Sequence, residues 1–63
     1  MINETIKLRR VEQKLTQQEL SEKSGVSQQL ISKIENGKAQ PSLRTITKLA
    51  EVLRLDINLK VIE

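Results

Sequence analysis

The sequence predicts an all-α domain built from four short helices, and three observations support this prediction. Apolar residues recur every three or four positions in four separate stretches, which is the period of a helix with one buried face. Serine or threonine, which cap helix starts, stands before three of these stretches. The two glycines and the single proline lie only between the stretches. With 63 residues, the chain has the length of one small domain.

The first helix is expected over residues 2–13. Ile2, Ile6 and Arg10 are spaced four apart and fall on one stripe of that helix. Arg10 thus occupies a position where an apolar residue would be usual, which favours a place against the domain. The alternatives are a surface charge or a phosphate contact.

The second helix is expected over residues 17–24. Thr16 and Glu19 form a capping box, in which the hydroxyl and the carboxylate each accept a hydrogen bond from the other residue's backbone amide. Gly25 ends the helix, because glycine takes the left-handed conformation without steric cost.

The third helix is expected over residues 28–35, after the cap Ser27, and the fourth over residues 43–54, after the cap Ser42. Asn36-Gly37 closes the third helix. The residues expected to face inward in this half of the chain are Val26, Ile31, Ile34, Leu43, Ile46, Leu49, Ala50 and Leu53.

The end of the chain changes period. Leu55, Ile57, Leu59 and Val61 alternate with polar residues, which predicts a short, half-buried β-strand over residues 55–61. Nothing else in the chain looks like a strand, so its edge would pair with the same strand of a second copy. We therefore expect a helical domain over 1–54 and a dimerisation segment over 55–63; the alternative is a tail that docks on its own domain.

The composition excludes several classes of function. There is no cysteine or histidine, which removes the commonest metal ligands and the usual general base, and no aromatic residue on which single-stranded bases could stack. No nucleophile–base pair or phosphate loop is visible, so we expect neither an enzyme nor a cofactor nor a metal. No apolar run approaches the ~20 residues that span a bilayer, and no signal peptide is apparent, so we expect a cytoplasmic protein. The net charge of +3 permits nucleic-acid binding without demanding it.

Two short helices joined by residues 25–27 form a tight helix-turn-helix. This turn lets the second helix protrude into a groove about as wide as a helix. Its outer face carries Gln28, Gln29, Ser32 and Lys33, whose side chains can bond to base edges. The alternative is a solvated polar face, but the turn and the caps beside it favour DNA recognition.

A set of residues between positions 6 and 53 matches the pattern of a known family. These residues are Leu15-Thr16-Gln17, Glu19-Leu20, Gly25-Val26-Ser27, Ile31, Ile34-Glu35-Asn36-Gly37, Pro41-Ser42-Leu43 and Leu49-Ala50. On them the sequence resembles the Cro/C1-type helix-turn-helix of lambdoid phage repressors and the Xre-like regulators. The resemblance implies a compact, four-helix, lambda-repressor-like fold and sequence-specific binding of double-stranded DNA.

The resemblance also implies residue roles. It places Gln28 and Gln29 at base-reading positions and Gln17 at a phosphate clamp, and it pairs Arg10 with Glu35 in a partly buried, structural salt bridge. The full set of implied DNA contacts is Gln17, Ser27, Gln28, Gln29, Ser32, Lys33, Asn36, Lys38 and Arg44.

Four positions depart from the family pattern. Lys14 and Arg54 stand where the family often has glycine. At Lys14, either the first helix ends differently or the residue is strained. Ser21 replaces the usual alanine and is nearly as small. Leu30 is unusual at an outward-leaning position, and we expect it to cover the core.

The alternating end of the chain is similar to the strand of DNA-binding antitoxins of persistence-type toxin–antitoxin pairs. We expect a homodimer that binds a palindromic operator as a repressor and lies on the nucleoid when bound. One alternative is an antitoxin that also binds a toxin protein. Another is a protein-binding module without DNA affinity, against which the uncharged-to-basic face of residues 28–33 argues.

Overall fold

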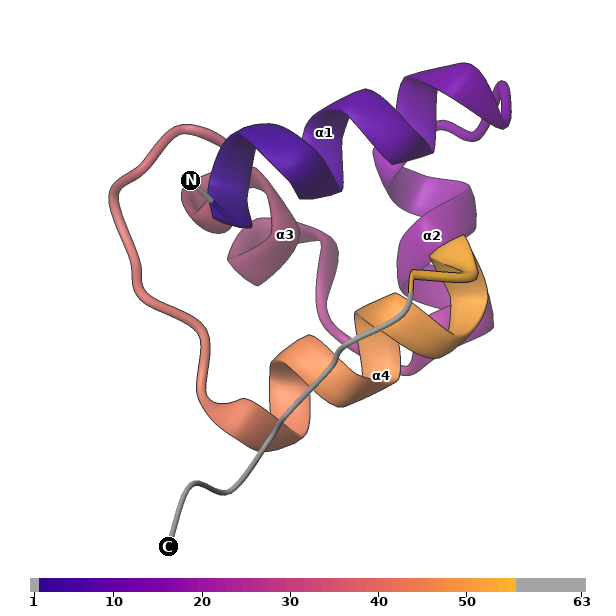
Figure 1. The fold of residues 1–63 in the computed structure, drawn as a ribbon. Coiled ribbons are helices and arrows are strands. Elements are labelled where there is room, and N and C mark those ends of the chain that lie inside the picture. Colours follow the sequence, from indigo (N-terminus) through magenta and orange to yellow (C-terminus); the bar gives the residue numbers. More distant parts are fainter. Residues whose placement is uncertain (1, 56–63) are drawn as a thin grey trace, which may run out of the picture.

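The computed structural model describes residues 2–55, which fold into four helices (Figure 1). They are α1 (Ile2–Glu12), α2 (Gln17–Ser24), α3 (Gln28–Glu35) and α4 (Leu43–Leu53). The expected all-α architecture is therefore confirmed over this part of the chain. None of the four helices is long and apolar enough to cross a membrane.

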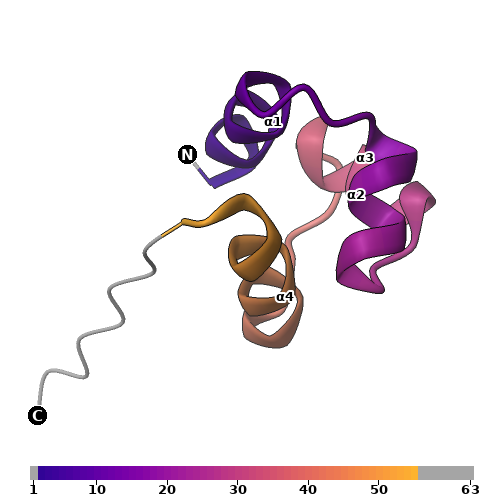
Figure 2. The same cartoon turned by 90° about the vertical axis from the view of Figure 1, so that its right-hand side faces the viewer.

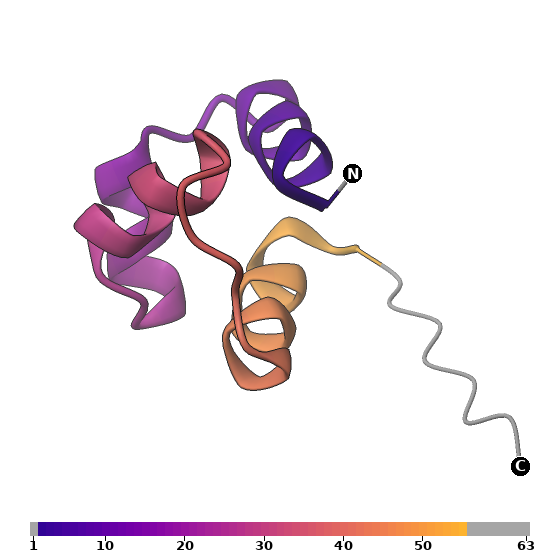
Figure 3. The ribbon, with the colours of Figure 1, turned by 90° about the vertical axis from the view of Figure 1, so that its left-hand side faces the viewer.

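Each helix packs mainly against two others. α1 and α2 do not pair closely, but each contacts both α3 and α4. The side-on views show α1 and α4 on one side of the domain and α2 and α3 on the other (Figures 2 and 3). The core where they meet is made of Ile6, Leu20, Val26, Ile31, Ile34, Leu49 and Leu53.

The predicted helix starts are confirmed by their hydrogen bonds. Thr16 Oγ1 accepts from the Glu19 amide at 3.0 Å, and Glu19 Oε1 accepts from the Thr16 amide at 2.9 Å, which completes the capping box. Ser27 and Ser42 cap α3 and α4 in the same way, through the amides three residues later. These caps fix where α2 and α3 begin and hence the geometry of the turn between them.

The helix ends depend on four residues in the left-handed conformation, of which two are not glycine. Gly25 and Gly37 have φ of 77° and 72°, while Lys14 and Arg54 have φ of 57° and 55°. The Lys14 amide donates to the Val11 carbonyl, and the next amide donates back to the carbonyl of Arg10, so α1 ends in a Schellman motif. Both α1 and α4 end one residue earlier than the sequence predicted. Gln13, the residue before Lys14, already lies in the turn that ends α1, and Arg54 is itself the cap of α4.

Leu43 is a correction to the predicted core, since 57% of it is exposed. At about 100° per residue, Leu43 lies at the edge of the apolar stripe of α4, whose centre is marked by Leu49 and Leu53. It is also the first residue of the helix. Ile46 is half-buried, whereas Ala50 is buried as expected. Leu30 packs against the core, as predicted.

The predicted strand over residues 55–61 falls almost entirely outside the described residues. Leu55 is described and is not part of a strand. Its amide donates to the Ala50 carbonyl at 2.9 Å, and its side chain packs against the core of its own domain. Leu55 therefore serves as the apolar residue that follows the cap of α4.

Candidate nucleic-acid interface

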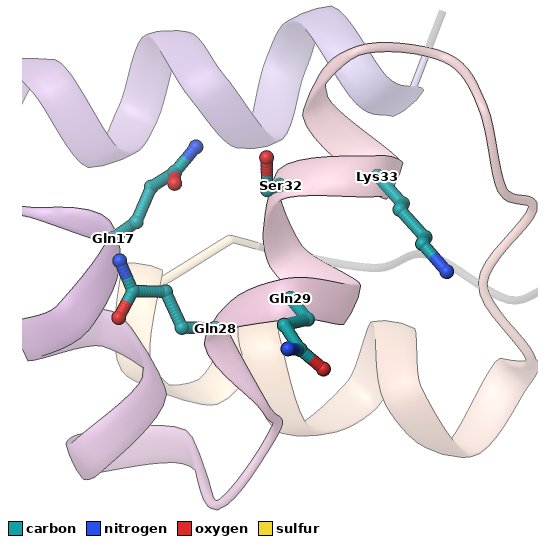
Figure 4. Close-up of a pocket in the computed structure, with 5 residues that line it drawn as sticks. All are labelled: Gln17, Gln28, Gln29, Ser32 and Lys33. Atoms are coloured by element: carbon teal, nitrogen blue, oxygen red, sulfur yellow. The ribbon is translucent and has the colours of Figure 1, made fainter.

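A surface hollow lies where the start of α2 meets the outer face of α3 (Figure 4). Its volume is about 550 Å³, and it is lined by Gln17, Gln28, Gln29, Ser32 and Lys33. These are five of the nine residues for which the sequence predicted DNA contacts. Among the described residues, no carboxylate belongs to this lining. The surface thus offers amide, hydroxyl and ammonium groups without acidic ones.

The residues of α3 reach the hollow because the opposite side of the helix is buried. Ile31 and Ile34 have no exposed surface, and they hold α3 against the core. Gln28, Gln29 and Lys33 are exposed on the other face, and Ser32 is half-buried at its edge. The first two follow the cap directly, so their amides lie at the start of the helix (Figure 4).

Gln17 contributes from the first turn of α2. It follows the cap Thr16, whose hydroxyl satisfies only the Glu19 amide. The other backbone amides of a first helical turn point out of the helix end, where together with the helix dipole they favour an anion. The side chain of Gln17 is half-buried, and its Nε2 donates to Oε1 of Glu35 at 3.1 Å.

Behind this hollow, Arg10 and Glu35 form the predicted ion pair. Arg10 Nε lies 2.7 Å from Glu35 Oε2, and Nη2 lies 2.9 Å from Oε1. Only 12% of the arginine side chain and 2% of the glutamate side chain are exposed. Burial works to raise the pKa of Glu35, but hydrogen bonds from Arg10 and Gln17 and the nearby positive charges outweigh it, so the pKa lies below its usual value. The hydrogen bond to Glu35 in turn raises the pKa of Arg10.

The four remaining predicted contacts are exposed but do not line the hollow. Ser27 uses its hydroxyl to cap α3, accepting from the Leu30 amide. Asn36 and Lys38 follow the end of α3, and Arg44 lies in the first turn of α4. They flank α3 rather than join the group beside Gln28.

The model of the family described as "Helix-turn-helix" matches residues 6–59, which is most of the sequence. This chain belongs to the Cro/C1-type helix-turn-helix family. The family match covers α2, the turn at residues 25–27 and α3, which carry the hollow.

Curated relatives agree with this assignment of the helix-turn-helix domain. The ImmF control region 10 kDa protein of Bacillus phage phi105 is 41% identical over 53 residues, which cover 84% of this chain and 59% of the relative. The uncharacterized HTH-type transcriptional regulator y4dL of Sinorhizobium fredii is 40% identical, over 89% of this chain and 29% of its own length. The SPbeta prophage-derived uncharacterized HTH-type transcriptional regulator YonR of Bacillus subtilis is 38% identical, over 84% of this chain and 49% of its own length. This helix-turn-helix domain thus spans between about a third and three fifths of these relatives. No solved structure shows a significant match.

Sequence reasoning missed two polar links in this helix-turn-helix domain. One is the hydrogen bond between Gln17 and Glu35, which are 18 positions apart. The other joins α1 and the residue after it to the end of α4: Arg9 Nη2 donates to the Leu53 carbonyl at 3.3 Å, and Gln13 Nε2 donates to the same oxygen at 2.6 Å. Nothing in the residue pattern pairs these positions, because both links join side chains to groups whose place is set by helix packing.

Proposed function

We propose that this chain is the sequence-specific DNA-binding part of a transcriptional regulator and that α3 is its recognition helix. The observation that carries the proposal is the hollow lined by Gln17, Gln28, Gln29, Ser32 and Lys33 at the junction of α2 and α3. Its hydrogen-bonding groups come from the outer face of α3 and the start of α2 and have no carboxylate among them. The names of the relatives, which include a phage control-region protein and HTH-type transcriptional regulators, support the same function.

In this proposal the exposed side chains of α3 read base edges in the major groove. The carboxamides of Gln28 and Gln29 can each bond to N6 and N7 of an adenine, and Lys33 can reach O6 and N7 of a guanine. Both amides lie in the first turn of α3 and are exposed, which suits the end of a helix that enters the groove. Ser32 adds a hydroxyl at the rim of the same face.

A second group of residues binds the DNA backbone and sets the register of α3. Gln17 stands at the start of α2, where the free amides of the first turn favour a phosphate. Lys38 is an exposed cation in the loop between α3 and α4, and Arg44 is an exposed cation in the first turn of α4. Ser27 and Asn36 mark the two ends of α3. Contacts of this kind position a protein on the duplex without reading its sequence.

The proposed active form is a homodimer on a palindromic operator, where it represses transcription by occupying the site. One recognition helix contacts only a few base pairs, whereas two helices about 34 Å apart read an inverted repeat on one face of the duplex. The dimer contacts proposed for this chain are Ile57, Leu59 and Val61; Leu55, which the alternating pattern also suggested, packs instead against the core of its own domain.

The test is a selection of binding sites from a pool of random duplex fragments. The intact chain is immobilised, fragments are retained at low salt, and their sequences are determined. We expect enrichment of an inverted repeat with adenine in each half-site. A variant with both Gln28→Ala and Gln29→Ala serves as the control and should retain fragments without that enrichment. If the folded, intact chain enriches no sequence and retains no duplex, the proposed function is wrong.

A further inference from the structure

The hydrogen bond between Gln17 and Glu35 joins the candidate DNA contact to the interior of the domain. Gln17 lines the hollow, whereas Glu35 does not, and only 2% of the glutamate side chain is exposed. The bond runs from Nε2 of Gln17 in α2 to Oε1 of Glu35 in α3 over 3.1 Å. Gln17 therefore links Glu35 to the hollow through a direct hydrogen bond.

We propose that Glu35 is a positioning residue for DNA recognition, which holds the Gln17 carboxamide in one orientation at the start of α2. The inference rests on the proposed function, since the ligand presented with this amide is a backbone phosphate of duplex DNA. Glu35 fixes one N–H of Gln17 and leaves the second for a phosphate oxygen beside the first turn of α2.

The carboxylate is suited to this role because it only accepts hydrogen bonds when ionised. The Gln17 amide must then turn its nitrogen, and not its oxygen, toward Glu35. A glutamine side chain free in solvent samples many rotamers, and ordering it on binding costs affinity. A side chain already held in place loses less conformational entropy on binding. The bond to Glu35 therefore orders Gln17 before DNA binds.

Arg10 makes Glu35 compatible with a phosphate nearby. A lone buried carboxylate would repel the phosphate, but Arg10 binds both oxygens at 2.7 and 2.9 Å and cancels the charge. The third donor of Arg10, Nη1, bonds the carbonyl of Leu15 at 2.7 Å, just before the cap of α2. The ion pair thus fixes the start of α2 by its backbone and by the Gln17 side chain together.

The affinity test is a double-mutant cycle with the intact chain on a duplex site selected by the wild-type protein. Binding is measured for Gln17→Ala, Glu35→Gln and the double variant, each shown to be folded by circular dichroism. E35Q leaves one acceptor oxygen for the three nitrogen donors, two from Arg10 and one from Gln17. Gln17 therefore loses the hydrogen bond that holds its side chain. We expect each single variant to weaken binding by about threefold to tenfold, which is the effect of ordering one long side chain. In the Q17A background, E35Q should have no further effect.

The matched control is Glu12→Gln, which removes an exposed carboxylate paired with Arg9 at 3.5 Å and should leave affinity unchanged. Equal weakening by E35Q in both backgrounds, or none in either, overturns the positioning role, because a merely structural residue does not depend on Gln17. Absence of duplex binding by the wild-type chain overturns the proposed function instead.

A second measurement serves if E35Q does not fold. In the wild-type chain without DNA, NMR follows solvent exchange of the side-chain amide protons of Gln17, Gln28 and Gln29. We expect the Gln17 protons to exchange more slowly, because the other two amides are exposed. Equal exchange at all three positions shows that Glu35 does not hold Gln17 and overturns the proposal.

Discussion

Arg10 and Glu35 bind each other at two points, through Nε–Oε2 at 2.7 Å and Nη2–Oε1 at 2.9 Å, and thereby join α1 to α3 across 25 positions of the chain. The pair replaces an apolar contact on the inner stripe of α1, one turn after the fully buried Ile6. Because Arg10 also bonds the carbonyl of Leu15, it reaches the segment before α2 as well. A single side chain therefore sets the relative position of three helices, two of which form the candidate DNA interface.

Removal of Arg10 should strongly destabilise this domain. Arg10→Met keeps most of the volume but leaves the Glu35 carboxylate buried without its cation, which costs about 3–5 kcal/mol of unfolding free energy. This is a large part of the ~3–9 kcal/mol expected for a domain of this size. Urea unfolding followed by circular dichroism measures the change, with a stabilising osmolyte present if the variant is partly unfolded.

Glu12→Gln is the matched control, because it removes the exposed ion pair of α1, which is worth about 0–1 kcal/mol. The double variant Arg10→Met with Glu35→Leu should recover much of the loss, since it removes the stranded charge. If R10M and E12Q are equally stable, the buried pair does not hold the helices together.

Acid should weaken the domain through Glu35. Burial alone would raise the pKa of this carboxyl, but the hydrogen bonds from Arg10 and Gln17 and the positive charges nearby hold it below the usual value. Glu35 therefore ionises more easily in the folded than in the unfolded chain. Its contribution is fully present above the unfolded pKa of about 4.3 and is lost as the pH falls through the lower, folded pKa. Urea unfolding at a series of pH values between about 6 and 3 measures this loss.

Two variants assign that pH dependence. Glu35→Gln should be less stable at neutral pH and should lose less stability on acidification, because the titrating group is gone. Glu19 also has a lowered pKa, chiefly because it accepts a hydrogen bond from the Thr16 backbone amide. Glu19→Gln keeps the capping-box bonds and should retain most of the wild-type acid dependence. The same acid dependence in E35Q and wild type would assign the effect to other carboxyls.

The backbone of this domain is largely readable from its sequence, because the signals are local. Thr16, Ser27 and Ser42 mark helix starts through bonds to amides three residues away, and Gly25 marks an end through its own conformational freedom. Such signals depend on neighbouring residues alone, so the structure confirms each of them.

The side-chain links are less readable, because they depend on how the helices pack. The Arg10–Glu35 pair was predictable only from the position of Arg10 on an apolar stripe together with the family resemblance. The bond from Gln17 to Glu35 left no such signal, since a glutamine at a helix start is ordinary. Leu43 was misjudged because periodicity marks the apolar stripe of α4 but not how far the packing extends along it.

Lys14 should be a site where glycine stabilises the protein. Its φ of 57° is costly for a side chain with a Cβ atom, and it occupies the cap position that favours glycine. Lys14→Gly should gain about 0.5–1 kcal/mol of unfolding free energy, because relief of this strain exceeds the added entropy of the unfolded chain. The gain is measured by thermal and urea unfolding.

Gly25→Ala tests the same argument in reverse. A Cβ added there meets no atom within 4 Å, so the change isolates the backbone cost at φ 77°. It should lose about 1 kcal/mol. A stabilising G25A, or a K14G that is no more stable than wild type, would show that left-handed strain is not what limits these helix ends.

Two classes of substitution should separate base contacts from phosphate contacts on the selected duplex. Gln29→Ala removes an exposed amide that lines the hollow, and it should cost about 1–3 kcal/mol on the preferred site and less on a site altered at one base pair. Lys38→Ala removes an exposed cation outside the hollow, so it should weaken all duplexes alike. It should also lower the steepness of the decrease of log affinity with log salt by about 1, because one fewer counterion is released.

Fluorescence anisotropy over a salt series, on the preferred site and its single-base variants, measures both the affinities and the salt dependence. Lys48→Ala is the control, since Lys48 is also an exposed lysine, but it lies on α4 and away from the hollow. If Q29A weakened every duplex by the same factor, Gln29 would be a backbone contact, and the recognition role would pass to the other side chains of α3.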